Sequence, residues 1–280
     1  MSLSAHLKNE NIKKLFSNFV TIPKIKSDMP IKAEPLTKRY GIVGTAFDYL
    51  LRFVIERTNL NSISQTWTAQ VCANSFFERN EKAKKIAISI IENALNSKTQ
   101  FIKSGKITND LIVASINLAY IDTIFRSRKI ELVDSFINDV SNPDEKDIQD
   151  IKNLYSLIEI KMFKSKSICV LNPTFGKASE LVQGADADLF IDNTLIDIKT
   201  VKNMALTSEY IYQLVGYFLL SKIDKIDGIS DKYSIKNLGL YFSRFAELIT
   251  LPIDQLIEIN KLPEFQKLFI KEIKSKIDKS

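Results

Sequence analysis

Four aspartates and one lysine interrupt two apolar stretches in the segment GADADLFIDNTLIDIKT, residues 184–200. Carboxylate oxygens are ligands that Mg²⁺ prefers, and the cation keeps its remaining positions for water and for a substrate phosphate. Asp188, Asp197 and Lys199 are the candidates for such chemistry, with Asp186 close by. Whether they can act together depends on how this segment folds.

A β-hairpin with a two-residue turn at Asp192 and Asn193 would bring two of the carboxylates together, and both residue types favour such turns. Counting outward from the turn, Asp188 falls directly opposite Asp197. Opposed side chains have Cβ atoms about 4.5–5.5 Å apart, and like charges at that distance destabilise a sheet unless something neutralises them. A divalent cation held between the two carboxylates would do so.

The same register places Asp186 opposite Lys199, so one face of the hairpin would present aspartates and a lysine. The other face would be apolar and would carry Leu189, Ile191, Ile196 and Ile198. A second interpretation is a surface hairpin, in which the aspartates only form turns and Lys199 pairs with Asp186. The spacing alone does not decide between these interpretations.

The segment after the hairpin adds two polar residues. TSEYIYQLVGYFLLSKI, residues 207–223, has the length and apolar character of a buried helix. Gln213 and Tyr217 are four residues apart, so they lie on one face of that helix. Buried polar side chains need hydrogen-bond partners, and the carboxylate hairpin offers them. The alternative is that Tyr217 packs in the core and Gln213 faces solvent.

These motifs resemble those of the PD-(D/E)XK nuclease superfamily, in particular its RecB-like branch. The branch is marked by an upstream aspartate, here Asp188, by a D-x-K-T strand, here residues 197–200, and by a Q-x-x-x-Y helix, here residues 213–217. An earlier helix of the branch carries a GTxxH element, and this chain has GTAFD at residues 44–48. Asp48 thus stands in the place of a metal-binding histidine, and a carboxylate suits a hard cation.

The resemblance implies a metal site formed by Asp48, Asp188 and Asp197, with Mg²⁺ or Mn²⁺ as the cofactor. Which aspartate fills the upstream position stays open, because Asp186 follows Gly184 by two residues and Asp188 by four. The cross-strand register favours Asp188.

The resemblance also implies a reaction, the hydrolysis of DNA phosphodiester bonds by a water that the cation positions. Lys199 would orient or activate that water, and Gln213 and Tyr217 would position the site or contact the DNA backbone. The implied catalytic residues are Asp188, Asp197, Lys199, Gln213 and Tyr217. Exonuclease and endonuclease activity stay open, as do roles in phage defence, phage replication or DNA repair.

The composition excludes several other kinds of site. Of the 280 residues one is histidine and two are cysteines, Cys72 and Cys169, which are far apart in the sequence. We therefore expect neither a zinc site nor Cys/His catalysis, so any metal must be bound by oxygen. The N-terminus lacks the apolar segment of a secretory signal, and no apolar run is long enough to span a bilayer. We expect a cytoplasmic protein with no membrane partner.

Hydrophobic periodicity divides the chain into three predicted units. Residues 1–63 would form an N-terminal arm and the first core helix. Residues 64–165 would form an all-helical insertion, in which Thr108 caps a helix. Residues 166–280 would form the nuclease core, with the catalytic hairpin, the Q-x-x-x-Y helix, a further hairpin over residues 238–252 and a C-terminal helix. The expected fold is α/β, a restriction-endonuclease-like core with a mixed central sheet flanked by helices and a large all-helical insertion.

Two other functions are consistent with the sequence. A catalytically inactive nucleic-acid-binding protein would keep the nuclease fold, and Asp48 in place of histidine favours it mildly. A helical scaffold would bind a protein partner through residues 64–165. The net charge of +6 is concentrated at residues 1–40 and 261–280, which suits contact with phosphate backbones. We expect DNA, single- or double-stranded, as the main partner, and a protein at the helical insertion as a second one.

Overall fold

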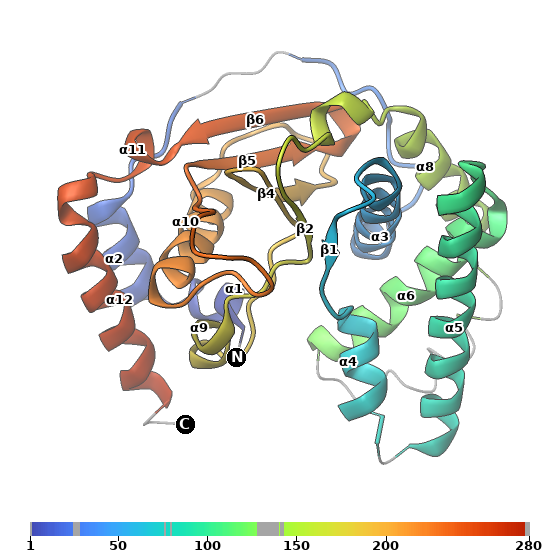
Figure 1. Ribbon diagram of the computed structural model, residues 1–280, viewed down its shortest axis with the longest axis horizontal. Helices are drawn as coiled ribbons and strands as arrows, with labels where there is room; N and C mark the ends of the chain where they lie inside the picture. Colours follow the sequence, from blue (N-terminus) through green and yellow to red (C-terminus); the bar gives the residue numbers. More distant parts are fainter. Residues whose placement is uncertain are drawn as a thin grey trace.

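The computed structural model describes residues 2–24, 29–75, 77–78, 80–127, 140 and 143–277. In these residues, helices surround a central sheet (Figure 1). The helices are α1 (Leu3–His6), α2 (Glu10–Phe19), α3 (Tyr40–Thr58), α4 (Thr68–Ser75), α5 (Glu81–Ser104), α6 (Asn109–Ser127), α8 (Glu145–Ser156), α9 (Gly176–Leu181), α10 (Ser208–Ile223), α11 (Ile253–Leu256) and α12 (Leu262–Ile277). Short 3₁₀ turns are η2 (Ile160–Phe163), η3 (Ser243–Phe245) and η4 (Ile259–Lys261).

Six strands in the described part of the chain form one open sheet in the order β1 to β6. They are β1 (Ile63–Ser64), β2 (Cys169–Leu171), β3 (Leu189–Ile191), β4 (Thr194–Lys199), β5 (Asn237–Phe242) and β6 (Glu247–Pro252). The pairs β2–β3, β3–β4 and β5–β6 are antiparallel, whereas β1–β2 and β4–β5 are parallel. The predicted α/β class with a mixed sheet is confirmed, as is the hairpin predicted over residues 238–252.

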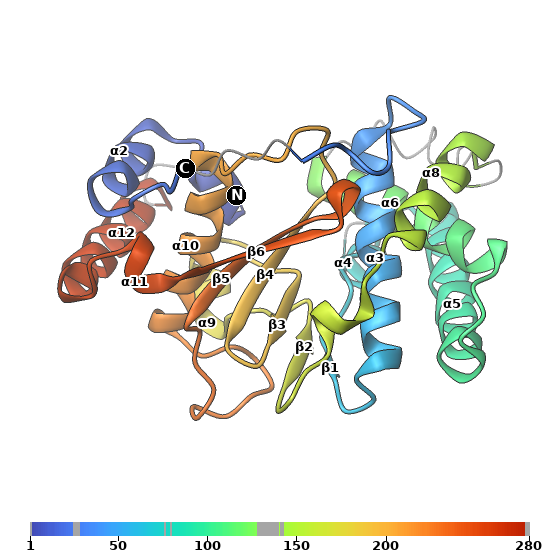
Figure 2. The ribbon, with the colours of Figure 1, turned by 90° about the horizontal axis from the view of Figure 1, so that it is seen from above.

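Helices cover both faces of the sheet, as Figure 2 shows with α10 on one side and α3 on the other. Phe190 and Leu195 belong to the hydrophobic cluster that contains α10, α2 and α12. Successive strand residues point to opposite faces, and the four apolar residues predicted for the other face all belong to or pack against the cluster around α3. The hairpin therefore lies between two hydrophobic layers.

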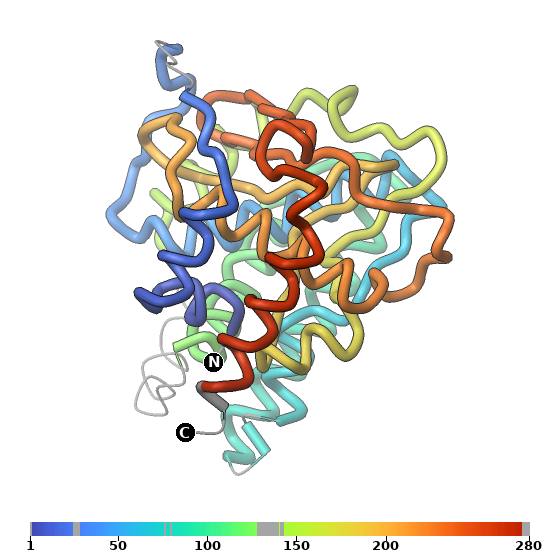
Figure 3. Tube along the Cα trace, turned by 90° about the vertical axis from the view of Figure 1, so that its left-hand side faces the viewer, coloured from blue at the N-terminus to red at the C-terminus, as the bar shows by residue number. Residues whose placement is uncertain are grey.

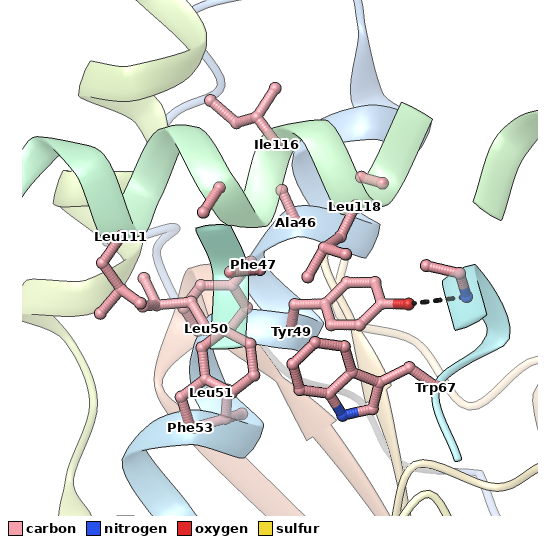
Figure 4. Close-up of a cluster of buried hydrophobic side chains, with 14 of the residues drawn as sticks. Ala46, Phe47, Tyr49, Leu50, Leu51, Phe53, Trp67, Leu111, Ile116 and Leu118 are labelled. Atoms are coloured by element: carbon pink, nitrogen blue, oxygen red, sulfur yellow. Dashed lines mark hydrogen bonds between the residues drawn. The ribbon is translucent and has the colours of Figure 1, made fainter. Parts of the chain in front are cut away.

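The described helices of residues 64–165 pack on α3. Figure 4 shows Ile116 and Leu118 of α6 near Ala46 of α3, and the rings of Tyr49 and Trp67 have centroids 5.8 Å apart at an interplanar angle of 79°. The predicted cap is confirmed, because Thr108 Oγ1 accepts a hydrogen bond from the N–H of Leu111 at 3.2 Å. Since these helices share one hydrophobic cluster with α3, the division into three units stays a prediction.

A buried ion pair joins the helical region to the sheet. The guanidinium of Arg244 in η3 donates to both carboxylate oxygens of Asp150 in α8, at 2.8 and 3.1 Å. It also donates to the carbonyl oxygen of Ala33 at 3.1 Å. Both members of the ion pair are fully buried, so the pair fixes α8 and the residue 33 segment against the β5–β6 connection.

The two ends of the chain meet on the α10 side of the sheet. Figure 3 shows α12, in red, beside the blue N-terminal helices, and the rings of Phe16 and Phe265 have centroids 5.0 Å apart. None of the helices that the structure describes is both long enough and apolar enough to cross a membrane.

Candidate active site

The β3–β4 hairpin has the register that the sequence predicts. Its paired residues end with Leu189 opposite Ile196, and Asp188 and Asp197 are the next residues outward. Asp188 Oδ2 accepts a hydrogen bond from the N–H of Ile198 at 2.6 Å, which ties the end of one strand to the other. The two carboxylates therefore come from the same end of the hairpin.

A polar cavity of about 210 Å³ lies at this end of the hairpin. Its walls come from the N-terminal residues up to α1, from α3, α6, β4 and α10, and from the loop before β3. The cavity is lined by every candidate residue that the sequence predicts, namely Asp48, Asp186, Asp188, Asp197, Lys199, Gln213 and Tyr217. At Gly44, α3 lies next to the end of β4, since a Cβ atom at this position would make an ordinary van der Waals contact with Thr200 Cβ, at 3.6 Å. Residues that are far apart in the sequence thus line one small space.

Lys199 connects the hairpin to α10. Its ammonium forms an ion pair with Asp197 Oδ2 and donates to Gln213 Oε1 at 2.9 Å. Gln213 Nε2 in turn donates to the Tyr217 hydroxyl at 3.1 Å. The polar pair on α10 is therefore joined to the hairpin through Lys199, and not through a carboxylate as expected, and it holds the lysine at the cavity wall.

Asp48 enters the cavity from α3. Its Oδ2 atom accepts a hydrogen bond from Arg52 Nη2 at 2.6 Å, and Arg52 Nη1 donates to Asn172 Oδ1 at 3.1 Å. The other oxygen of Asp48 is buried and has no hydrogen-bond partner among the residues that the structure describes. A buried acceptor without a donor is costly, so this oxygen favours the binding of a positively charged group.

Burial dominates the electrostatics of the carboxylates. It raises the pKa of Asp188 well above the ordinary value, and the neighbouring charges of Asp48 and Asp197 raise this pKa further. Burial also raises the pKa of Asp48, although Arg52 opposes the effect. For Lys199, burial is the largest single effect and lowers the pKa, but the attraction and hydrogen bond of Asp197 together with the charge of Asp188 outweigh it, and the net pKa is raised. The cavity thus holds a protonated lysine beside a carboxyl group at Asp188 whose charged form is disfavoured by burial and by the neighbouring carboxylates.

The described residues contain no group of three carboxylate, imidazole or thiolate side chains already arranged around one point. Two of the carboxylates are in ion pairs instead, Asp48 with Arg52 and Asp197 with Lys199. The donors still fit a hard divalent cation, since Asp48, Asp188 and Asp197 supply only oxygen and one buried oxygen has no partner.

The expected position of Asp186 opposite Lys199 is wrong. The pairing between β3 and β4 ends at Leu189 and Ile196, whereas the residues before β3 keep their antiparallel register with the β2 side of the sheet, where Asp186 forms an isolated bridge with Thr174. The carboxylate of Asp186 accepts a hydrogen bond from Arg126 Nη2 at 2.8 Å. Asp188 directly follows the last pair of the hairpin on the side of Asp197, whereas Asp186 is held by Arg126, although both aspartates line the cavity.

Two further cavity residues come from α6 and were not predicted from the sequence. Asp122 is buried, and its Oδ1 atom accepts a hydrogen bond from the Tyr49 hydroxyl at 2.9 Å. Burial raises the pKa of Asp122 to about 7. Arg126 lies one helical turn later. An aspartate and an arginine four residues apart are a common surface pair on helices, so no local signal marks them as site residues.

Comparison of the chain with models of protein families, with curated proteins and with solved structures gives no match. A function must therefore be inferred from the cavity and from the sequence motifs.

Proposed function

We propose that this chain is a metal-dependent nuclease that hydrolyses DNA phosphodiester bonds, with the restriction-endonuclease-like core of the PD-(D/E)XK superfamily. One observation carries the proposal: Asp48, Asp188, Asp197 and Lys199 line one cavity, although they come from α3 and from the hairpin. An open mixed sheet with a helix on each face supports the fold assignment. DNA is preferred to RNA on the resemblance of the motifs alone.

Asp48, Asp188 and Asp197 would hold Mg²⁺ or Mn²⁺. The bound cation would polarise a phosphoryl oxygen and stabilise the charge that develops during hydrolysis. A cation in the cavity would compete with Arg52 for Asp48 and with Lys199 for Asp197, because these ion pairs use the same carboxylates. It would also stabilise the ionised form of Asp188, which burial and the neighbouring carboxylates disfavour.

Lys199 would orient the attacking water or stabilise the transition state, and it would not act as a base. The pKa of its ammonium is raised by Asp197 despite burial, so the group stays protonated at neutral pH. Gln213 Oε1 accepts from this ammonium and Tyr217 supports Gln213. These two residues of α10 would therefore position Lys199.

A titration with Mn²⁺ tests the proposal against its rivals. The purified protein is incubated with linear and circular DNA at increasing Mn²⁺ and the products are separated on denaturing and native gels. A nuclease cleaves DNA only when the cation is present, and cleavage of circular DNA identifies an endonuclease. A protein that retards DNA at every Mn²⁺ concentration without cleaving it is the inactive binding protein. A protein that does neither has the scaffold function, and the nuclease proposal is then wrong.

A further inference from the structure

Helix α6 belongs to the helical region, yet it forms one wall of the candidate active site. It contributes Asp122 and Arg126, which lie on the same face of the helix because they are four residues apart. Asp122 is buried, whereas the side chain of Arg126 is 53% exposed. Arg126 is therefore the residue of this wall that a large ligand can reach.

The guanidinium of Arg126 is held at the edge of the cavity. Nη2 donates to Asp186 Oδ2 at 2.8 Å and to Thr68 Oγ1 at 3.5 Å. Counting only residues that the structure describes, Nη1 and Nε of Arg126 make no hydrogen bonds. The side chain of Asp186 is 27% exposed, so the pair is only partly open to solvent, and Asp186 is the main cause of the raised pKa of Arg126. An incoming phosphate must therefore replace the carboxylate as a charged hydrogen-bond partner, which its oxygens can do.

The cavity is rich in carboxylates, so a polyanion can bind there only if positively charged side chains contact it. Five aspartates line the cavity, and its lysines and arginines, among the described residues, are Lys199 and Arg126. Lys199 is engaged by Asp197 and Gln213. Arg126 is the cation that can exchange an aspartate for an incoming anion, and the planar fork of a guanidinium matches two oxygens of a phosphate.

We propose that Arg126 binds a backbone phosphate of the substrate strand and that Asp186 holds its guanidinium until the substrate arrives. The inference rests on the proposed nuclease function and adds to it a phosphate-binding residue that lies outside the recognised motifs. A phosphate replaces Asp186 as the partner of Arg126, and α6 thereby contributes directly to substrate binding.

The test compares Arg126→Gln, Asp186→Asn and the wild type in their affinity for a fluorescein-labelled single-stranded oligonucleotide. Fluorescence anisotropy is measured in Ca²⁺, under conditions in which a gel shows the oligonucleotide intact, and is repeated at several salt concentrations. Arg57→Gln is the matched control, because Arg57 is an exposed arginine in the last turn of α3 and does not line the cavity. Thermal melts of all variants report on folding.

Arg126→Gln should raise the Kd roughly 10- to 100-fold, as expected for one lost hydrogen-bonded charge contact. The slope of log K against log salt should become shallower by about 0.7, because one phosphate contact on a single strand is lost. Asp186→Asn should lower the Kd, since it removes the competitor for Arg126 and one negative charge. Arg57→Gln should leave Kd unchanged.

A purely structural ion pair predicts a different pattern. In that case Arg126→Gln and Asp186→Asn lower the melting temperature and weaken binding to the same extent, with an unchanged salt slope, and this result overturns the inference. Wild-type affinity in Arg126→Gln also overturns it. If the wild type cleaves DNA and Arg126→Gln has the Kd and the salt slope of the wild type, only the role of Arg126 is wrong. If the wild type neither binds nor cleaves, the proposed function is wrong as well.

Discussion

Replacement of Asp122 by Asn should change the stability of the protein in a pH-dependent way. Asp122 is 2% exposed, and its hydrogen bond from Tyr49 does not compensate for the loss of water around its charge. Burial raises its pKa from 3.8 to about 7. An asparagine has nearly the same volume, can still accept from the Tyr49 hydroxyl and carries no charge at any pH.

The sign of the effect follows from the raised pKa. The folded protein binds the proton on Asp122 more tightly than the unfolded chain does, so the stability that this proton contributes is fully present below about pH 4 and is lost as the pH rises through about 7. Each tenfold change in proton affinity is worth about 1.4 kcal/mol, so the loss reaches about 4 kcal/mol at high pH. As the pH rises from about 5 to about 8, the free energy of unfolding of the Asn variant should therefore increase by about 3 kcal/mol relative to that of the wild type.

Urea denaturation in EDTA, followed by circular dichroism at several pH values, measures this difference. The attraction between Asp122 and Arg126 acts only on the ionised carboxylate and is already part of the shifted pKa, so the pH dependence of the difference is the decisive quantity. Asp110→Asn, at an exposed position on the same helix, is the control and should give a constant difference. A constant difference for Asp122→Asn would refute the reasoning, because it would show that Asp122 is already ionised in the folded protein at the lower pH.

Three further predictions concern the site and its frame. Mn²⁺ should raise the melting temperature of the wild type, because it binds the folded state. Asp188→Asn should lose this response, whereas Asp186→Asn should keep it. The reverse result would mean that Asp186, and not Asp188, binds the metal. Lys199→Ala should keep the Mn²⁺ response but hydrolyse DNA more slowly in single-turnover assays, and loss of Mn²⁺ binding with normal chemistry would contradict its assigned role. Arg244→Met should lower the free energy of unfolding by about 3–5 kcal/mol in urea, since it leaves the buried carboxylate of Asp150 unpaired; a loss below about 1 kcal/mol, the range of exposed pairs, would show that the pair is not effectively buried.

The β3–β4 hairpin could be predicted from the sequence because its turn residues and its apolar alternation are local features. Asp192 adopts a left-handed backbone conformation with φ of 56°, as the two-residue turn requires. Its carboxylate accepts hydrogen bonds from the N–H groups of residues 166–168, which fixes the turn against the preceding segment. The alternation of apolar residues then sets the register, and with it the position of Asp188 beside Asp197.

The course of the chain before β3 could not be predicted in the same way. Continuing the hairpin register to Asp186 assumes that β3 and β4 stay paired, but their pairing ends at Leu189 and Ile196, and Asp186 stays paired only on the β2 side, with Thr174. Likewise β1 has two residues and pairs in parallel with β2, more than a hundred residues later in the sequence. Pairings of this kind depend on the tertiary fold, and so short a strand has no periodicity of its own.

Asp122 and Arg126 are site residues that could not be predicted from the sequence, for the same reason. They line the cavity only because α6 packs along α3, and this packing follows from a large shared hydrophobic cluster rather than from any motif. The residues that could be predicted belong to the hairpin, to α10 and to the GTAFD segment, where the resemblance supplied the pattern. Residues contributed by a distant helix require the three-dimensional structure.

Cleavage of DNA by the wild type and by Asp197→Ala, in Mn²⁺ and in EDTA, tests the central claim most directly. Asp254→Asn in α11, at an exposed position that does not line the cavity, is the control, and thermal melts show that each variant is folded. The account predicts Mn²⁺-dependent cleavage by the wild type and by Asp254→Asn and no cleavage by Asp197→Ala. Cleavage by folded Asp197→Ala at the rate of the wild type would contradict the assignment of the active site.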